Sequence, residues 1–214
     1  MAPVVVLAKH KSSLAMKTQR KTTPKVRSGK VLKKDRHRLT PNYWNTPQAY
    51  LQIDVRKPGK GYKHFLKKRD IHRFLALLPK REELMEEIDA VVLDSGGGPD
   101  GWYSGHVIGI CAWEKDKTCY LAKDYFCEHK AIFDRLNLTY KSGKKWVECD
   151  FTEDQIRAYQ LLHIFLHELG HHHDRMSTKK KIDPAPRGEQ FAEDYALKHE
   201  KLIWNRFFEE FNMT

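Results

Sequence analysis

A histidine-rich segment at residues 161–175 constrains the fold of this chain more than any other. It contains the pattern H-E-x-x-H at positions 167–171. Residues four apart on an α-helix share one face, with Cβ atoms about 5–6 Å apart, so both imidazoles can bind one tetrahedral zinc ion at about 2.0–2.1 Å. Glu168 then lies beside the metal, where its carboxylate can take a proton from a zinc-bound water. We therefore expect a helix here whose histidine face lines a site.

The residues around the motif support a helix with two different faces. Thr152 and Gln155 form a capping-box pattern, with two acids in the first turn between them. At about 100° per residue, one face is apolar and carries Ala158, Leu162, Phe165, Leu169 and Met176. The opposite face is polar and carries Gln160, His163, His167, His171 and Asp174. A buried helix that presents a metal site needs this division.

A third protein ligand is expected, since catalytic zinc sites usually have three and leave one position open. The last predicted helix, from Glu189 to about Phe211, begins with Glu189, Glu193 and Asp194. Two acids four apart share a face, so one can bind zinc while the other accepts a hydrogen bond from a ligand histidine. Asp174, three residues after His171, can reach the metal region or pair with a nearby arginine.

These two segments resemble the gluzincins, zinc metallopeptidases with H-E-x-x-H on one helix and a glutamate ligand on the next. The sequence E-Q-F-A-E-D-Y-A at 189–196 is similar to the E-x-x-A-D-x-x-A element of the CAAX-prenyl-protease and minigluzincin group. Phage-repressor-cleaving zincins share the layout. The resemblance covers residues 152–200 and implies His167, His171 and Glu189 as ligands, with Glu193 hydrogen-bonded to a ligand. A glutamate replaces the usual aspartate at 193, so Glu193 and Asp194 stay open as alternative ligands.

The remaining pattern predicts an α+β fold. We expect strands in 50–55, 88–93 and 107–113, a hairpin formed by 138–140 and 146–151, and helices in 70–78, 81–87, 122–136, 152–176 and 189–211. The glycine-rich loop 95–100 reads as a turn or a mobile rim. With the resemblance, this implies a zincin-like domain over 41–214. In such a domain a small twisted mixed sheet packs on the active-site helix, and a second, long C-terminal helix follows.

Basic residues concentrate at the N-terminus. Residues 1–40 hold twelve Lys or Arg and one acid, Asp35, out of 39 basic and 28 acidic residues, which leaves 27 of each for 41–214. The segment has no apolar periodicity, so we expect a disordered basic arm. Such an arm can contact nucleic acid non-specifically through phosphates or serve only as a solubilising extension.

The sequence also indicates the cellular compartment of the protein. No apolar run approaches the roughly 18 residues of a membrane span, and the first residues lack the pattern of a signal peptide. The four cysteines form no C-x-x-C pair, so we expect reduced, mostly buried thiols rather than a thiolate zinc site. A cytoplasmic protein with no membrane span is the resulting expectation.

The main functional hypothesis is a zinc-dependent endopeptidase that acts on a protein or peptide substrate, with one Zn²⁺ per chain and Glu168 as general base. His163, Tyr195 and His106 are candidates to line the cleft or to stabilise the oxyanion. The substrate is expected to lie extended along the strand 107–113. The alternative is a non-enzymatic, nucleic-acid-associated protein with a structural zinc site and the basic arm as its functional part. A protease that the arm directs to nucleic-acid-bound proteins would combine the two.

Overall fold

The structure is a computed structural model that describes residues 26–27, 30–31, 42–178 and 187–213. The chain divides into two units, residues 1–41 and 42–214. In the first unit, β1 (Val26–Arg27) pairs antiparallel with β2 (Lys30–Val31). The rest of the basic segment lies outside the described residues, so the disorder expected for it stays a prediction.

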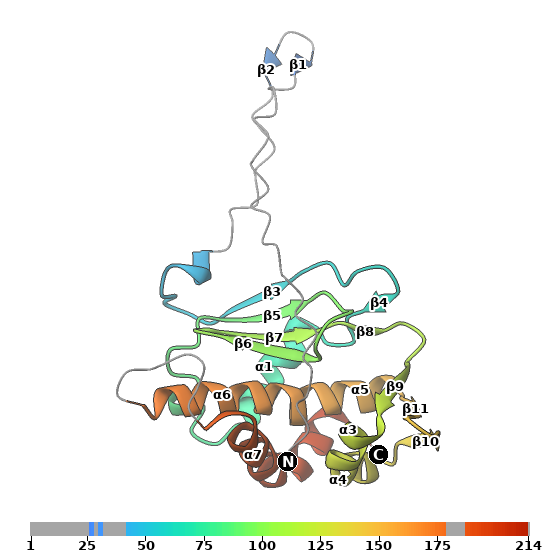
Figure 1. The fold of residues 1–214 in the computed structure, drawn as a ribbon. Coiled ribbons are helices and arrows are strands. Elements are labelled where there is room, and N and C mark those ends of the chain that lie inside the picture. The colour runs from blue at the N-terminus through green and yellow to red at the C-terminus, as the bar shows by residue number, and fades with distance from the viewer. Residues whose placement is uncertain (1–25, 28–29, 32–41, 179–186, 214) are drawn as a thin grey trace, which may run out of the picture. The chain divides into compact units, whose positions relative to one another are not determined.

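A four-stranded mixed sheet forms one layer of the second unit (Figure 1). In spatial order its strands are β3 (Gln52–Val55), β5 (Ala90–Asp94), β7 (Val107–Cys111) and β6 (Gly101–Ser104). β3, β5 and β7 are parallel, whereas β6 is antiparallel to β7. Every residue of β7 is buried, as expected for a strand covered on both faces. The three predicted strands of this sheet are confirmed, and β6 is an additional strand.

The position of β7 corrects one expectation. The strand predicted over 107–113 cannot offer a free edge to a substrate, because β7 lies inside the sheet and pairs with β5 on one side and β6 on the other. Its hydrogen-bonding groups are therefore used within the fold. β6 is the edge strand on this side, and in the part of the chain that the structure describes it pairs with β7 alone.

A long helical segment crosses the sheet, in light orange in Figure 1. It consists of α5 (Glu153–Tyr159), the π-helical segment η2 (Gln160–Phe165) and α6 (Leu166–Met176). The predicted capping box is present: Gln155 N donates to Thr152 Oγ1 over 3.1 Å, and Thr152 N donates to Gln155 Oε1 over 2.8 Å. The π-helical segment was not predicted, because a uniform α-helical period of about 100° per residue gives no signal for a wider turn. Such segments are rare and frequent at functional sites.

The last helix, α7 (Gly188–Phe211), packs along α6 and covers it from below in Figure 1. The two backbones approach closely at Gly170, where an added Cβ would lie 2.7 Å from Ala192 Cα. A further helix, α1 (Lys68–Leu77), joins the same core, since the Phe74 ring packs edge-on against Phe165 and Phe207 at 5.3 and 6.1 Å. The predicted helices 70–78 and 189–211 are thus confirmed.

A second, three-stranded antiparallel sheet lies at one end of the long helix with two short helices (Figure 1). Its order is β10 (Thr139–Ser142), β11 (Trp146–Asp150) and β9 (Thr118–Ala122). The predicted hairpin is confirmed, and β9 is additional. The single helix predicted over 122–136 is instead two, α3 (Lys123–Glu128) and α4 (Lys130–Arg135), which meet at His129. The smaller elements are η1 (Asn42–Trp44), α2 (Arg81–Leu84), and the paired β4 (Tyr62–Lys63) and β8 (Trp113–Glu114).

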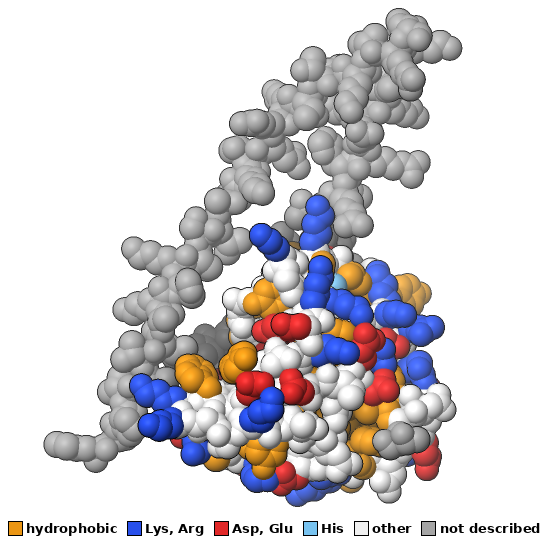
Figure 2. All heavy atoms as spheres, turned by 90° about the vertical axis from the view of Figure 1, so that its right-hand side faces the viewer, with side chains coloured by type: hydrophobic (Ala, Val, Ile, Leu, Met, Phe, Trp, Pro, Cys, Tyr) orange, Lys and Arg blue, Asp and Glu red, His pale blue; other side chains and the backbone are white. Residues whose placement is uncertain are grey.

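The fold is therefore of the α+β class, as predicted. Among the described residues, no helix has both the length and the apolar character needed to cross a membrane. Figure 2 shows one face of the molecule, on which basic and acidic side chains are intermixed. This mixture agrees with the equal numbers of basic and acidic residues in 41–214.

The four cysteines are free thiols, as expected. Cys111, Cys119 and Cys149 are buried, and Cys127 is exposed. Cys119 and Cys149 face each other across β9 and β11.

The contact between α6 and α7 can be tested with Gly170→Ala. Alanine favours a helix over glycine by about 1 kcal/mol, but here its Cβ would also lie 3.0 Å from Ala192 O and 3.1 Å from Tyr195 Cβ. Backbone atoms cannot move aside as a flexible side chain does. The cost of overpacking, about 1–3 kcal/mol, should therefore exceed the gain in helix propensity. We expect a lower free energy of unfolding in urea. Gly98→Ala is the control, since its Cβ would meet no atom within 4 Å. A Gly170→Ala protein as stable as the wild type would contradict the close approach.

Candidate metal centre

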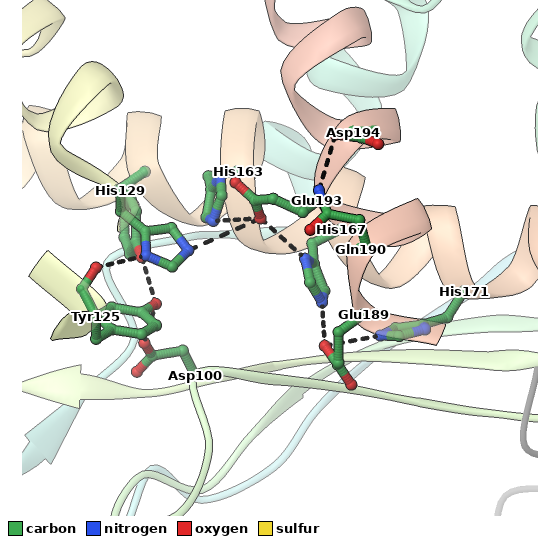
Figure 3. A network of polar contacts seen from close by, with 11 residues as sticks. Asp100, Tyr125, His129, His163, His167, His171, Glu189, Gln190, Glu193 and Asp194 are labelled. Carbon is green, nitrogen blue, oxygen red and sulfur yellow. Dashed lines mark hydrogen bonds and ion pairs between the residues drawn. The ribbon is translucent and has the colours of Figure 1, made fainter. Parts of the chain in front are cut away.

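Two histidines of α6 and one glutamate of α7 place their ligand atoms together (Figure 3). Glu189 Oε2 lies 3.1 Å from His167 Nε2 and 3.6 Å from His171 Nε2. Two ligand atoms bound at about 2.0–2.1 Å to a tetrahedral ion lie about 3.3–3.4 Å apart, so both distances are close to what one zinc ion requires. Burial lowers the pKa of His171, which leaves this imidazole unprotonated and able to bind a metal at neutral pH. The donor set predicted from the sequence therefore fits a zinc ion.

His167 lies between two glutamates, and this arrangement assigns them different roles. Its Nε2 faces Glu189, whereas its Nδ1 lies 3.3 Å from Glu193 Oε2. If Nε2 binds a metal, Nδ1 carries the proton and donates a hydrogen bond to Glu193. This hydrogen bond fixes the tautomer and the orientation of the ring. The geometry thus favours Glu189 over Glu193 as the metal ligand, in agreement with the resemblance.

Asp174 determines where α7 begins. Its fully buried carboxylate accepts hydrogen bonds from Arg187 N and Nε, both at 2.7 Å, and from Gly188 N at 3.0 Å. The last turn of α6 is thereby tied to the first turn of α7, directly before Glu189. Burial acts to raise the pKa of Asp174, but the hydrogen bonds and charge of Arg187 outweigh it, so the pKa lies below its usual value. Asp174 therefore positions Glu189, and it is not one of the three residues whose possible ligand atoms lie together.

Glu168 is buried between α6 and β6. An added Cβ on Gly101 would lie 2.5 Å from Ile164 Cγ2 and 2.8 Å from Glu168 Oε1, so a side chain at this position of β6 would displace both residues. Burial raises the pKa of Glu168 to about 7. A carboxylate with a pKa near neutrality is suited to exchange protons.

His167, Glu168, Glu189 and Glu193 line one pocket with a volume of about 850 Å³, whereas His171 and Asp174 are not among its lining residues. Glu168, His167 and Glu189 form one part of its wall, and Gly98–Gly101 forms another. The loop predicted as a turn or a mobile rim is thus part of the pocket wall. Helix α3 adds Tyr125 and Glu128.

The other predicted site residues divide between this pocket and the surrounding structure. His163 lines the pocket, but its Nε2 faces Glu193 at 3.6 Å. Asp194 also lines it and is exposed, with Oδ1 accepting from Gln190 Nε2 over 3.1 Å. Tyr195 and His106 do not line it. The Tyr195 ring stacks on His173 of α6 and on His199 of α7. His106 Nδ1 lies 2.9 Å from the Glu87 carbonyl.

His129 lines the pocket and was missed in the sequence. It lies at the junction of α3 and α4, where Nδ1 donates to the Tyr125 carbonyl over 2.8 Å, and its Nε2 faces Glu193 at 3.8 Å. Asp100 was missed as well; it accepts a hydrogen bond from Tyr125 Oη over 3.3 Å. A single histidine or aspartate outside a spaced motif carries no signal that it faces a site, so sequence reasoning could not have found either one.

Comparisons with known proteins add nothing to this geometry. No protein-family model, curated protein or solved structure matches the chain.

The connection between α6 and α7 predicts the effect of Asp174→Asn. Loss of the charge weakens three hydrogen bonds, so we expect the free energy of unfolding to fall by about 1.5–3 kcal/mol at pH 7. Because the pKa of Asp174 is lowered in the folded state, its contribution is present above the unfolded pKa of about 3.9 and is lost as the pH falls through the folded value. The difference between wild type and variant should therefore shrink below about pH 4. Urea unfolding at several pH values measures it.

Asp194→Asn is the matched control, since Asp194 lies near the start of α7, the helix that Asp174 contacts, but is exposed. It should leave stability unchanged to within about 0.5 kcal/mol. Equal effects of the two substitutions would contradict the positioning role of Asp174.

Proposed function

We propose that this chain is a zinc-dependent metallopeptidase with a zincin-like fold and the ligand arrangement of a gluzincin. The proposal rests on one observation above all: His167, His171 and Glu189 converge at zinc-ligand spacing, and Glu168 lines the pocket that His167 and Glu189 also line. A structural zinc site has no need of a carboxylate in this position. A pocket of about 850 Å³ beside the ligands also supports a site that receives a substrate rather than a closed structural site.

The chemistry follows from these groups. His167, His171 and Glu189 would hold the zinc ion, which would supply a Lewis acid to polarise the scissile carbonyl and make water more acidic. Glu168 takes a proton from the attacking water at its carboxylate and delivers it to the nitrogen of the leaving amine. Glu193 holds His167 in the required tautomer through Nδ1. The burial that raises the pKa of Glu168 makes its carboxylate a better proton acceptor than an exposed glutamate.

The substrate is proposed to bind as an extended peptide along β6. This strand is at the edge of the sheet, and Gly101, its first residue, lines the pocket next to Glu168. An extended chain can add to such an edge through main-chain hydrogen bonds. Of the three residues predicted to line the cleft or stabilise an oxyanion, only His163 lies on the pocket wall.

The alternative function, nucleic-acid association through a basic arm, depends on residues 1–40. Nearly all of them lie outside the described residues, so this function stays a prediction, as does a protease directed to nucleic-acid-bound proteins.

Glu168→Gln tests the proposed reaction. Glutamine has nearly the same shape but cannot accept a proton, so we expect zinc binding to persist while hydrolysis falls by about 10²–10⁴-fold. A mixed peptide library provides a substrate of unrestricted sequence, and newly formed amino groups report cleavage. Glu128→Gln is the matched control, since it lines the same pocket from α3. Unchanged cleavage by Glu168→Gln would refute the mechanism.

Zinc titration of the metal-stripped protein tests the ligands. His167→Ala and Glu189→Ala should each abolish the tightest binding, because each removes one of three protein ligands. Glu193→Ala should weaken it about 10–100-fold, as expected for a residue that orients a ligand. Asp194→Ala, next to Glu193 in the chain, should leave the affinity unchanged. Calorimetry measures these affinities, and tight binding retained by Glu189→Ala would exclude Glu189 as the ligand.

A further inference from the structure

A second group of possible metal ligands lies in the same pocket, one helical turn from the first. It consists of His129 at the junction of α3 and α4, His163 in η2 and Glu193 in α7, with their ligand atoms within 4.8 Å of one another. Glu193 Oε2 is 3.6 Å from His163 Nε2 and 3.8 Å from His129 Nε2. Figure 3 shows both imidazoles directed at this one carboxylate. His163 and His129 are only 3% and 9% exposed, so these groups are withdrawn from bulk water.

The spacing is too long for hydrogen bonds and close to that of metal ligands. N–H···O bonds measure about 2.7–3.2 Å, so neither histidine is well hydrogen-bonded to Glu193. Ligand atoms around one tetrahedral ion at about 2.0–2.1 Å lie about 3.3–3.4 Å apart. A movement of a few tenths of an ångström would bring all three atoms onto one ion.

The hydrogen bond of His129 supports a cation at this position. Its Nδ1 must carry a proton, because it donates to the Tyr125 carbonyl. In the neutral ring, Nε2 then presents a lone pair to the carboxylate of Glu193, and two electron-rich atoms face each other. A metal ion between them turns this repulsion into two bonds.

A proton on Nε2 of His129, in place of a metal ion, would not give every polar atom of this group a hydrogen-bond partner. Glu193 Oε2 would then face three imidazole donors, from His129, His163 and the Nδ1 of His167. A carboxylate oxygen accepts about two hydrogen bonds, and the contact with His167 at 3.3 Å is the shortest of the three. His163 has no hydrogen-bond partner for its buried Nδ1 among the described residues, so this ring is not held by polar contacts elsewhere.

We propose that His129, His163 and Glu193 form a second binding site for a divalent transition-metal ion, adjoining the first. Two imidazoles and one carboxylate suit Zn²⁺, Co²⁺ or Fe²⁺ and leave coordination positions open toward the pocket. Glu193 joins the two sites, because the oxygen that would bind the second ion also accepts from His167. The chain then binds two metal ions, rather than the one that the H-E-x-x-H motif predicts.

The number of zinc ions per chain tests this site separately from the proposed peptidase. The metal-stripped full-length protein is titrated with Zn²⁺ alone, and bound metal is counted by elemental analysis after removal of free ions. We expect two ions in the wild type and one in His129→Phe, which keeps a planar ring but no ligand atom. We expect one ion also in His171→Ala, which removes a ligand of the first site only, and none in the double variant.

His72→Ala is the control for weak binding by surface histidines, since His72 is exposed on α1 and should leave two ions bound. One ion in the wild type and one in His129→Phe would overturn the second site, and so would two ions in both proteins. If His129→Phe does not fold, His129→Asn is used in its place. A wild-type protein that binds only one zinc ion would overturn the second site without either variant. Two ions retained by His171→Ala would instead refute the first site and with it the proposed function.

Discussion

The close contact between α6 and α7 is the constraint on which the site depends. Gly170 has no side chain at the point where the Ala192 backbone approaches, so the two helices lie nearer to each other than side chains normally permit. At the end of α6, the buried carboxylate of Asp174 binds the first backbone groups of α7. One contact sets the separation of the helices and the other sets the register. Together they place two glutamates, four residues apart, opposite two histidines, also four apart.

The same packing concentrates ionisable groups where water is scarce. Burial raises the pKa of Glu168 and Asp100 and lowers that of His163, the last to about 3. Structural cores rarely hold so many groups of this kind, because each charged form loses hydration. A site that binds a cation and moves protons requires them, and a bound cation offsets the cost of gathering carboxylates. Perturbed carboxylates and imidazoles along one pocket therefore favour a functional role over a purely structural one.

The residues of this site that the sequence predicted are those specified by local spacing. The histidines of H-E-x-x-H, the capping box at Thr152 and the glutamates of α7 all follow from helical periodicity, which depends on near neighbours alone. β6 could not be predicted in this way, because Gly-Trp-Tyr-Ser lacks an alternating pattern and becomes a strand through pairing with β7. The break at His129 depends likewise on tertiary packing. So does the placement of 107–113 inside the sheet, since sequence identifies a strand more readily than its neighbours.

The histidines of the long helical segment contribute to two groups of possible metal ligands, and the π-helical segment lies between α5 and α6 where these groups divide. Hydrogen bonding from i to i+5 widens the turns of η2 relative to those of α6. His163 belongs to the widened part and faces His129, whereas His167 and His171 belong to the regular part and face Glu189. Glu193 lies between them and contacts His163 and His167 through the same oxygen. Any change in the charge on Glu193, by a proton or by a metal ion, must therefore alter the hydrogen bond that orients His167. The two halves of the pocket are linked through this one carboxylate.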